Sequence, residues 1–422
     1  MHEKPQPVVF LSATLWWATC PRLAMALLNS GCRVSAICPS GHPLRTVARV
    51  EKIYLYRAWD PAGSLRASLR AAQPDLIIPC DDGAAWQLHD LYEKDAALRP
   101  LIELSLGASE AYRTLESRYK TLETASKLGI KVAPSRAITS CEDFRDPRLE
   151  WPAVLKIDGT WGGDGAVHLH NPVQAAQVFA TLFGVVKAAW AWKYYLVNRH
   201  PLEMWLWRRI KGLPVTLQKF IQGRQVTTMF ACWQGEVLAS VTAEVLASRS
   251  ATGAATFLQL RRHEEIENAS RLLAGRFKLN GFHGLDFIVE DGTGDAYMIE
   301  MNPRATQLGH LNVLPEGSLV DVLAAKLMNT AASPAAGTTR IDNTIIALFP
   351  YAWKTDPGNR LLITGYHDVP WDQPELVNEL MRKPWPERRL LIRILSGLRW
   401  LWHRGEKPVN PSSEEDHATL AS

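Results

Sequence analysis

The chain has 422 residues, of which 47% are hydrophobic and 21% charged, enough for roughly two or three folded units with cores of their own. The formal net charge of +4 is too small to indicate nucleic-acid binding, and no run reaches the roughly 18 apolar residues of a bilayer-spanning helix. The six cysteines form neither a Cys-x-x-Cys pair nor a zinc-like spacing. We therefore expect reduced thiols in a cytoplasmic protein that binds no nucleic acid.

The amino-terminal part alternates between apolar runs and helical segments. Three runs have the composition of buried strands: residues 8–12, 33–38 and 74–79. A helix over residues 21–30, ended by Gly31, separates the first two. This alternation predicts an α/β, Rossmann-like parallel sheet, although the Gly-x-Gly-x-x-Gly fingerprint of dinucleotide-binding folds does not follow the first strand. Asp81-Asp82-Gly83 follows the third strand, where capping of the next helix is favoured over a ligand role.

The middle of the chain mixes helices with hairpin-like strands, which predicts an α+β unit. The expected strands are residues 154–157, 166–170, 215–221, 225–233, 237–245, 284–290 and 296–301. The expected helices are residues 109–117, 119–128, 172–183 and about 262–278. Residues 331–337 have the composition of a linker, so we expect the residues beyond it to form an extension.

A glycine-rich segment, residues 158–165, directly follows the predicted strand that carries Lys156. Glycines let backbone N–H groups approach phosphate oxygens because no Cβ stands in the way, and a nearby ammonium group neutralises the phosphate charge. The P-loop pattern Gly-x₄-Gly-Lys-Ser/Thr is absent. A phosphate-binding loop and a simple glycine-rich turn both remain open for this segment.

Three oxygen-bearing side chains converge on the last predicted hairpin. Glu300 and Asn302 are two residues apart and so face the same side of one strand, and Asp286 lies on the strand opposite. A hard cation such as Mg²⁺ prefers such oxygen donors alongside nucleotide phosphates. The alternative is a solvated hairpin, which we disfavour because the apolar residues of both strands make them half buried.

Residues 218–223, Gln-Lys-Phe-Ile-Gln-Gly, combine an amide, apolar side chains and an accessible backbone. Such a segment suits the edge and face of a purine. Taken alone the pattern is unspecific, because many edge strands share it.

Taken in this order, the elements resemble the ATP-grasp superfamily over roughly residues 1–330. The segments Glu300-Met301-Asn302-Pro303-Arg304 and Thr160-Trp161-Gly162-Gly163-Asp164-Gly165 are most similar to the carbamoyl-phosphate synthetase and biotin carboxylase branch. The resemblance implies a Rossmann-like pre-ATP-grasp domain at residues 1–108 and a two-subdomain ATP-grasp domain at residues 109–330. Its mobile lid subdomain would span about residues 153–222, and a carboxy-terminal extension would occupy residues 338–422.

The resemblance also implies the cofactors ATP and Mg²⁺ (or Mn²⁺), with ATP held between the two subdomains. The implied phosphate-binding residues are Lys120, Lys156, Gly162, Gly163 and Gly165. The implied nucleoside-binding residues are Gln218, Lys219, Phe220, Ile221 and, beside the ribose, Gln225. The implied metal ligands are Asp286, Glu300 and Asn302, and the implied catalytic residues are Lys156 and Arg304. Gln218 and Gln225 depart from the family pattern, which commonly has Glu at the first position and an acid at the second.

By the same resemblance, the implied activity is that of a stand-alone ligase: ATP phosphorylates a small-molecule carboxylate to an acyl phosphate, which an amine then attacks. Arg304 would stabilise the transferring phosphoryl group and the acyl phosphate. We see no second ATP-grasp half, no amidotransferase-like domain and no biotin-accepting Met-Lys-Met segment. Two alternatives stay open: a nucleotide-binding, membrane-associated regulatory protein without ligation, and a carboxylase-type enzyme that uses bicarbonate. His283 and His310 flank the Glu300 motif, but a structural role is favoured for both.

Two stretches are basic and rich in tryptophan. Residues 187–211 hold six basic residues and one acid, residues 382–407 hold eight and two, and together they contain seven of the 16 tryptophans. Residues 388–404 also have the spacing of a basic amphipathic helix, which is typical of contact with an anionic membrane. The alternatives are a helix packed on the domain and, for the first stretch, a packed helical pair or a homodimer contact. The two stretches motivate the hypothesis that the protein lies peripherally at the inner face of the membrane and acts on an amphiphilic or lipid-linked substrate.

Overall fold

The computed structural model describes residues 6–57, 59–158, 166–183, 215–250, 253–330 and 343–388. The glycine-rich loop with Gly162, Gly163 and Gly165, the Trp-rich stretch 187–211 and the basic residues after Arg388 lie outside the described residues. In the part of the chain that is described, no helix is both long and apolar enough to cross a bilayer.

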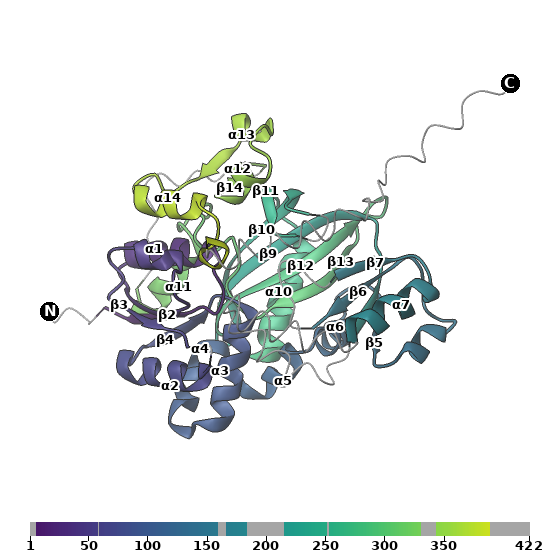
Figure 1. Cartoon of the computed structure of the whole chain (residues 1–422), viewed down its shortest axis with the longest axis horizontal. Coiled ribbons are helices and arrows are strands. Elements are labelled where there is room, and N and C mark those ends of the chain that lie inside the picture. Colours follow the sequence, from purple (N-terminus) through teal and green to yellow (C-terminus); the bar gives the residue numbers. More distant parts are fainter. Residues whose placement is uncertain are drawn as a thin grey trace.

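The amino-terminal part forms a four-stranded parallel sheet in the order β3-β2-β1-β4 (Figure 1). Its strands are β1 (Val8–Ser12), β2 (Arg33–Cys38), β3 (Lys52–Leu55) and β4 (Leu76–Pro79). Its helices are α1 (Thr19–Asn29), α2 (Pro61–Ala72), α3 (Asp82–Lys94) and α4 (Arg99–Leu106). Alternate residues of β1 face opposite cores: Val9 and Leu11 pack with α1, whereas Phe10 packs with α2, α3 and α4. The predicted parallel, doubly wound sheet is confirmed.

A seven-stranded sheet occupies the centre of the molecule in the order β13-β12-β9-β10-β11-β14-β15. Its strands are β9 (Gly223–Trp233), β10 (Glu236–Ser248), β11 (Ala255–Leu260), β12 (Gly281–Glu290), β13 (Ala296–Asn302), β14 (Ile345–Leu348) and β15 (Tyr366–Asp368). All neighbours pair antiparallel except β14 and β15. One face packs on α10 (Glu264–Phe277), and the other packs on α11 (Leu319–Met328) and the amino-terminal unit.

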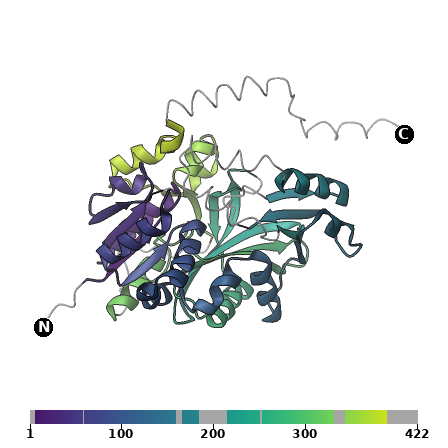
Figure 2. The same ribbon diagram turned by 60° about the horizontal axis from the view of Figure 1, so that its bottom comes forward.

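A third, four-stranded antiparallel sheet lies at the far end from the amino-terminal unit, as Figures 1 and 2 both show. Its order is β5-β8-β6-β7, with β5 (Ser135–Ile138), β6 (Ala153–Ile157), β7 (Ala166–Leu169) and β8 (Val215–Lys219). The helix α7 (Pro172–Phe183) covers it, and α5 (Tyr112–Leu115) and α6 (Arg118–Lys127) precede it. β6 and β7 are consecutive strands, so the glycine-rich segment is their connection.

The carboxy-terminal described residues are joined to the central sheet. Strand β14 pairs with β11, and Ile346 and Ala347 are fully buried. The helices here are α12 (Tyr351–Thr355), α13 (Leu361–Thr364) and α14 (Pro374–Met381). Short 3₁₀ turns complete the described elements: Pro43–Thr46, Ala96–Leu98, Ser109–Ala111, Cys141–Arg145 and Trp385–Arg388. The first described part of the predicted extension therefore adds two strands, β14 and β15, to the sheet that also contains the hairpin β12–β13.

Candidate active site

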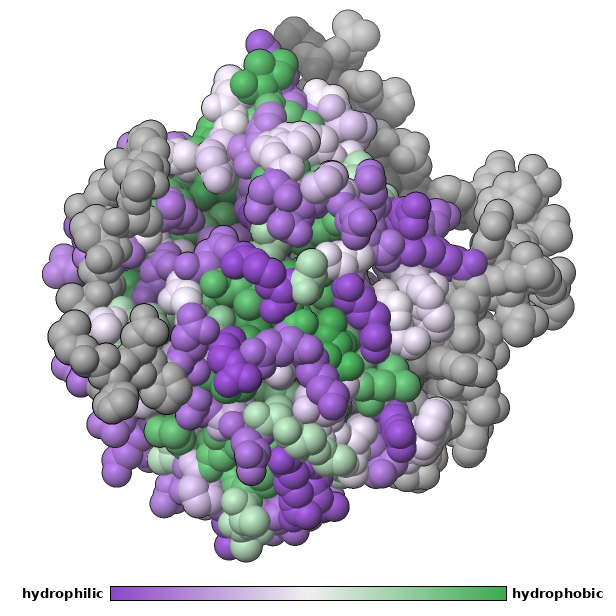
Figure 3. Space-filling model, turned by 90° about the vertical axis from the view of Figure 1, so that its left-hand side faces the viewer, coloured by the Kyte–Doolittle hydropathy of each residue, from purple (hydrophilic) through white to green (hydrophobic). Residues whose placement is uncertain are grey.

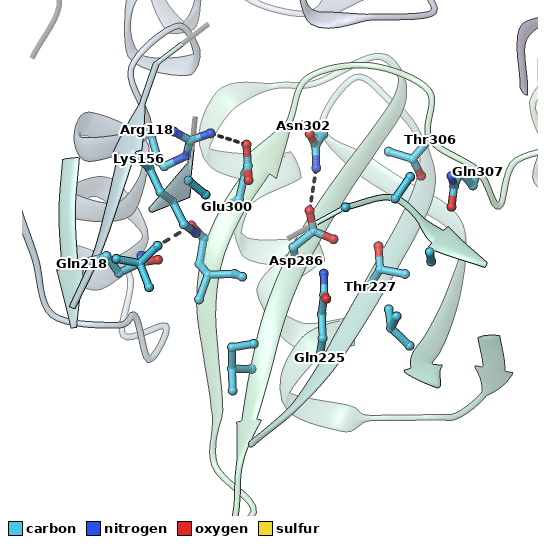
Figure 4. Close-up of a pocket in the computed structure, with 18 of the residues that line it drawn as sticks. Arg118, Lys156, Gln218, Gln225, Thr227, Asp286, Glu300, Asn302, Thr306 and Gln307 are labelled. Atoms are coloured by element: carbon cyan, nitrogen blue, oxygen red, sulfur yellow. Dashed lines mark hydrogen bonds and ion pairs between the residues drawn. The ribbon is translucent and has the colours of Figure 1, made fainter. Parts of the chain in front are cut away.

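A cavity of about 400 Å³ lies where the three sheets meet. The small sheet contributes Lys156 and Gln218, and the central hairpin β12–β13 contributes Asp286, Glu300 and Asn302 (Figure 4). The amino-terminal unit lines the other end of the cavity with residues that follow β1 and β4. They are Trp17, Thr19, Cys80 and Asp82. Ligand sites of parallel sheets lie at this carboxyl edge because the strands all end there.

Two acidic side chains occupy the centre of the cavity wall. Asp286 and Glu300 are cross-strand partners on β12 and β13, so both carboxylates project from the same face of the hairpin. Arg118 donates from Nη2 to Glu300 Oε1 at 2.6 Å and from Nη1 to Asp158 Oδ1 at 3.3 Å. Its guanidinium therefore bridges the central hairpin and the end of β6.

Arg118 reaches the cavity because of how α6 begins. Ser117 is the N-cap and accepts a hydrogen bond from the Lys120 N–H, so Arg118 is the first helical residue. Lys120, two residues later, is exposed and is not among the residues that line the cavity. A shift of two positions on an α-helix turns a side chain by about 200°. Among the described residues, Arg118 therefore lines the cavity, and Lys120, which the resemblance implied as a phosphate-binding residue, does not.

A chain of contacts runs from Asp286 to the amino-terminal unit. Asn302 Nδ2 donates to Asp286 Oδ2 at 2.9 Å, and its Oδ1 accepts from Arg304 Nη2 at 3.1 Å. Arg304 Nε in turn donates to Asp82 Oδ2 at 2.9 Å, and the Arg304 guanidinium lies 5.8 Å from the centre of the Trp17 ring. Asn302 and Arg304 are therefore held in one polar network that runs from Asp286 to Asp82.

Burial and charge set the ionisation of these groups. Burial and the nearby Glu300 raise the pKa of Asp286 above its ordinary value. Burial also acts to raise the pKa of Glu300, but Arg118 and Lys156 outweigh it, and the net pKa is lowered. Burial raises the pKa of Asp158 to about 6, although Arg118 acts to lower it. The site is thus crowded with negative charge that cations offset.

Lys156 is the second cation of this centre. Its Nζ donates to the Ile299 carbonyl oxygen at 3.5 Å. Burial lowers the pKa of Lys156 to about 8, with Glu300 acting to raise it and Arg118 acting to lower it. The ammonium group therefore loses its proton more readily than an exposed lysine does.

The donor set fits a divalent cation that arrives with a phosphate ligand. No three His, Cys, Asp or Glu side chains form a ready metal site in the described ranges. Asp286 and Glu300 instead offer two carboxylates, which with phosphate oxygens and water make up the usual environment of Mg²⁺. Burial first, and the charge of Glu300 second, raise the pKa of Asp286, and a cation beside the two carboxylates would favour the ionised form of Asp286.

The small-sheet end of the cavity is largely apolar. Val154, Ala166, Ile221, Ile288 and Ile299 line it, together with Lys219, Phe220 and Gln225. Gln218 is buried and donates from Nε2 to Ser135 Oγ at 3.2 Å and to the Ile299 carbonyl at 3.5 Å, and the Lys219 ammonium pairs with Glu150. The structure thus places all five predicted nucleoside-site residues in the lining of the cavity, with Gln218 on the small sheet and Gln225 on β9 of the central sheet (Figure 4).

The two histidines that flank the motif do not line the cavity. His283 is buried, its Nε2 lies 2.9 Å from the Asn280 carbonyl oxygen, and burial lowers its pKa to about 4. His310 Nε2 lies 2.9 Å from Asp368 Oδ2. The structural role favoured for both agrees with these contacts. Sequence reasoning missed Arg118, the residues after β13 (Thr306, Gln307 and Leu308) and the residues of the amino-terminal unit that line the cavity. For the last group the Asp81-Asp82 pair was the one visible signal.

Comparison with known proteins identifies the class. Residues 203–307 match the family model of the ATP-grasp domain, and no curated protein matches the chain. The N5-carboxyaminoimidazole synthetase of Staphylococcus aureus, complexed with ADP, is similar in structure, with a TM-score of 0.57 and 16% identity over 82% of each chain. The biotin carboxylase domain of the Hydrogenobacter thermophilus 2-oxoglutarate carboxylase, bound to MgADP, ADP and bicarbonate, gives 0.57 and 13% over 80% of this chain and 73% of that one.

A third similar structure is the N5-carboxyaminoimidazole synthase of Aspergillus clavatus with ADP and 5-aminoimidazole ribonucleotide, with a TM-score of 0.56 and 12% identity over 81% of this chain and 80% of that one. At these identities the likeness shows the fold alone. This chain therefore carries an ATP-grasp domain on an ATP-grasp fold preceded by a parallel sheet, and the resemblance inferred from its motifs is confirmed.

Proposed function

We propose that this chain is an ATP- and Mg²⁺-dependent ligase that activates a carboxylate as an acyl phosphate and joins it to an amine. One observation carries the proposal. The carboxylates of Asp286 and Glu300 share a cavity wall with the cations of Arg118, Lys156 and Arg304, next to an apolar slot. This is the combination of groups that phosphoryl transfer needs, because its catalysis consists mainly of positioning and charge neutralisation.

The nucleotide would lie along the small sheet. The purine fits the apolar end beside Phe220 and Ile221, whose backbone edges the slot, and Gln225 on β9 stands near the ribose. Arg118 and Lys156 would hold the phosphates. In our proposal Gly162, Gly163 and Gly165, in the connection between β6 and β7, supply backbone N–H groups to the same phosphates, and residues 153–222 act as the lid over an ATP-grasp domain of residues 109–330.

Asp286 and Glu300 would hold the magnesium ion, which supplies charge neutralisation between the nucleotide phosphates. Asn302 orients Asp286 and Arg304, since its amide donates to the Asp286 carboxylate and accepts from the Arg304 guanidinium. The Arg304 guanidinium faces the position next to these carboxylates, where it can stabilise the phosphoryl group as it moves to the acceptor carboxylate.

The reaction itself has two steps. An oxygen of the substrate carboxylate attacks the γ-phosphorus of ATP, and ADP leaves with the electrons of the broken P–O bond. The amine nitrogen then attacks the acyl carbon, and inorganic phosphate leaves. The protein's share is to hold the reacting groups in line and to exclude water from the acyl phosphate.

The identity of the carboxylate has a second candidate in bicarbonate. The biotin carboxylase domain that shares this fold was solved with a bicarbonate anion, and the cavity here is lined by the cationic side chain of Arg304. Because Arg304 can pair with a small anion in this cavity, bicarbonate belongs in the first set of acids to be tested. A regulatory protein without turnover is the less favoured function, because the cations and carboxylates that transfer requires are all present in one cavity.

We also propose that the chain works at a membrane surface. Its two basic, Trp-rich stretches motivate this, and the described residues next to the second stretch expose large apolar side chains: Ile363 (86% exposed), Tyr366 (57%) and Trp371 (71%). Figure 3, which views the end of the molecule with the amino-terminal sheet, shows hydrophobic and hydrophilic residues interspersed over this face. Co-sedimentation with anionic but not neutral vesicles is the expected result, and equal recovery in both supernatants would contradict it.

The ligase proposal is tested by product analysis. The purified chain is incubated with ATP, Mg²⁺, a panel of carboxylates including bicarbonate, and hydroxylamine, which traps acyl phosphates as hydroxamates. We expect ADP, phosphate and a hydroxamate with at least one acid, and formation of AMP and pyrophosphate would contradict the mechanism. Glu300→Gln should lower turnover by about 100-fold or more, whereas Glu316→Gln, at an exposed acid outside the cavity, should leave it unchanged.

A further inference from the structure

We propose that Asp82 binds the ammonium group of the amine substrate, and that this substrate is a cationic amine without a phosphate group. The inference rests on the proposed ligase function and names the acceptor class for the same site. It also assigns a task to the residues after β4, for which helix capping was favoured from sequence.

Capping and ligand binding fall on two different aspartates. Asp81 is the N-cap of α3 and is buried, and its carboxylate accepts from Thr14 N and Oγ1, both at 2.6 Å, from Leu15 N and from Ala84 N. Asp82 takes no part in that network. Asp81 thus holds the backbone that follows β1 and the first turn of α3 in place, and the neighbouring Asp82 side chain lines the cavity.

The two oxygens of Asp82 have different surroundings. Oδ2 accepts from Arg304 Nε at 2.9 Å. Oδ1 has no hydrogen-bond partner among the described residues, and the side chain is 18% exposed at the cavity wall. One oxygen is therefore anchored, and the other is presented to a ligand.

The order of the charges defines which ligand fits. Along the cavity stand Asp286, Asn302, Arg304 and Asp82, each in contact with the next. A carboxylate or acyl phosphate held by Arg304 therefore has the metal-binding pair on one side and Asp82 on the other. Asp82 lies where the second substrate must approach the acyl carbon.

Charge balance favours a cation at this position. The described residues that line this end are Trp17, Thr19, Cys80, Asp82, Arg304, Thr306, Gln307 and Leu308, of which only Asp82 and Arg304 are charged. When Arg304 engages the acyl phosphate, Asp82 loses its counter-charge, and an ammonium group restores it. Arg118, the next cation of the cavity, acts on Asp82 only from a distance; it pairs with Asp158 and Glu300 and in our proposal holds the nucleotide phosphates. It is therefore not free to bind a phosphate group of the amine, and Trp17 and Leu308 suit an apolar body.

With Asp82 in this role, the attack of the amine on the acyl phosphate balances in atoms and charge. The substrate ammonium transfers one proton to Asp82 Oδ1, which passes it to solvent, and leaves a neutral amine. The nitrogen lone pair forms the C–N bond to the acyl carbon, the C–O bond to phosphate breaks, and the second proton leaves with phosphate as HPO₄²⁻. No oxidant, reductant or further co-reactant is required.

The test compares two nucleophiles in one enzyme. With the acid found by the hydroxylamine screen, turnover is measured with hydroxylamine, which is uncharged at neutral pH, and with a panel of ethanolamine, free amino acids and O-phosphoethanolamine. In the wild type we expect an amide with a cationic or zwitterionic amine and none with O-phosphoethanolamine. Asp82→Asn should lower the ratio of amine to hydroxylamine turnover by about 100-fold.

The control is Glu264→Gln, which also removes an acid from the first turn of a long helix, α10, but at an exposed position outside the cavity. This variant should leave turnover with hydroxylamine, turnover with the amine and the ratio of the two unchanged. An unchanged ratio in Asp82→Asn, or amide formation with O-phosphoethanolamine, would overturn the inference while the ligase function stands. No hydroxamate from the wild type with any acid would instead refute the ligase function, and the inference with it.

Discussion

Replacement of Arg118 by methionine tests whether this side chain, and not Lys120, is the cation of the site. Arg118 is 10% exposed and pairs with Asp158 and Glu300, which are 2% and 29% exposed. Arg118→Met keeps the bulk of the side chain but leaves two carboxylates without their partner. Removing one member of a buried pair costs about 3 to 5 kcal/mol, and because Glu300 is partly exposed and Lys156 lies nearby, we expect about 3 kcal/mol.

The loss of unfolding free energy in Arg118→Met should depend on pH. In the wild type Arg118 and Lys156 keep the pKa of Glu300 below its ordinary value, so this group contributes stability above its unfolded pKa that is lost as pH falls. The pKa of Asp158 is already raised to about 6, so its burial costs stability that grows as pH rises above the unfolded pKa and is fully present above about 6. Without Arg118 both pKa values move up, and protonation at pH 5 should recover at least about 1 kcal/mol of the loss seen at pH 8.

Urea unfolding at pH 8 and pH 5 measures both effects, with Lys120→Met as the matched control. Lys120 lies on the same helix and is exposed, so its replacement should change the free energy of unfolding by no more than about 0.5 kcal/mol. Equal losses for the two variants, or an Arg118→Met deficit that does not shrink at pH 5, would refute the reasoning.

Three further predictions follow from the same geometry. Burial lowers the pKa of Lys156 to about 8, so MgADP affinity measured by calorimetry should fall between pH 7 and pH 9. Lys156→Arg should flatten that pH profile, since arginine stays charged. A flat wild-type profile would argue against contact between Lys156 and the nucleotide phosphates. Asp368 bonds both α1 and the loop after β13, so Asp368→Asn should speed hydrogen exchange in residues 14–23 and 303–311. Asp372→Asn, at an exposed site, should not change the exchange rates. Equal exchange in both variants would show that Asp368 does not stabilise these two segments. Phe220→Ala should weaken binding of ADP by about tenfold but leave inorganic triphosphate binding unchanged, and equal weakening of both would place the purine elsewhere.

The elements with continuous apolar runs were predictable from sequence. The strands Val8–Ser12 and Arg33–Cys38 occur with the expected bounds, and the helix expected at about 262–278 is α10. The strands β3, β5 and β11 were missed. β3 and β5 are short and only half buried, so their side chains leave no clear alternation.

The site was predictable where its residues are close in sequence. Glu300 and Asn302 share a strand face, and Asp286 opposes them across a hairpin, so period-two spacing was enough. Arg118 was missed because Lys120 was assigned from the family resemblance, and nothing in the local sequence shows which of two basic residues on one helix faces the cavity. The contact between Arg304 and Asp82 joins residues 222 positions apart, and no local pattern encodes it.

Transfer of an ¹⁸O label from the substrate carboxylate to phosphate tests the central claim, activation of the carboxylate as an acyl phosphate, most directly. The acid found in the screen is labelled with ¹⁸O in its carboxylate and incubated with ATP, Mg²⁺, the amine and the enzyme, and the released phosphate is analysed by mass spectrometry. Activation as an acyl phosphate predicts that each phosphate carries one ¹⁸O atom from the carboxylate. Unlabelled phosphate in a reaction that still forms the amide would contradict it.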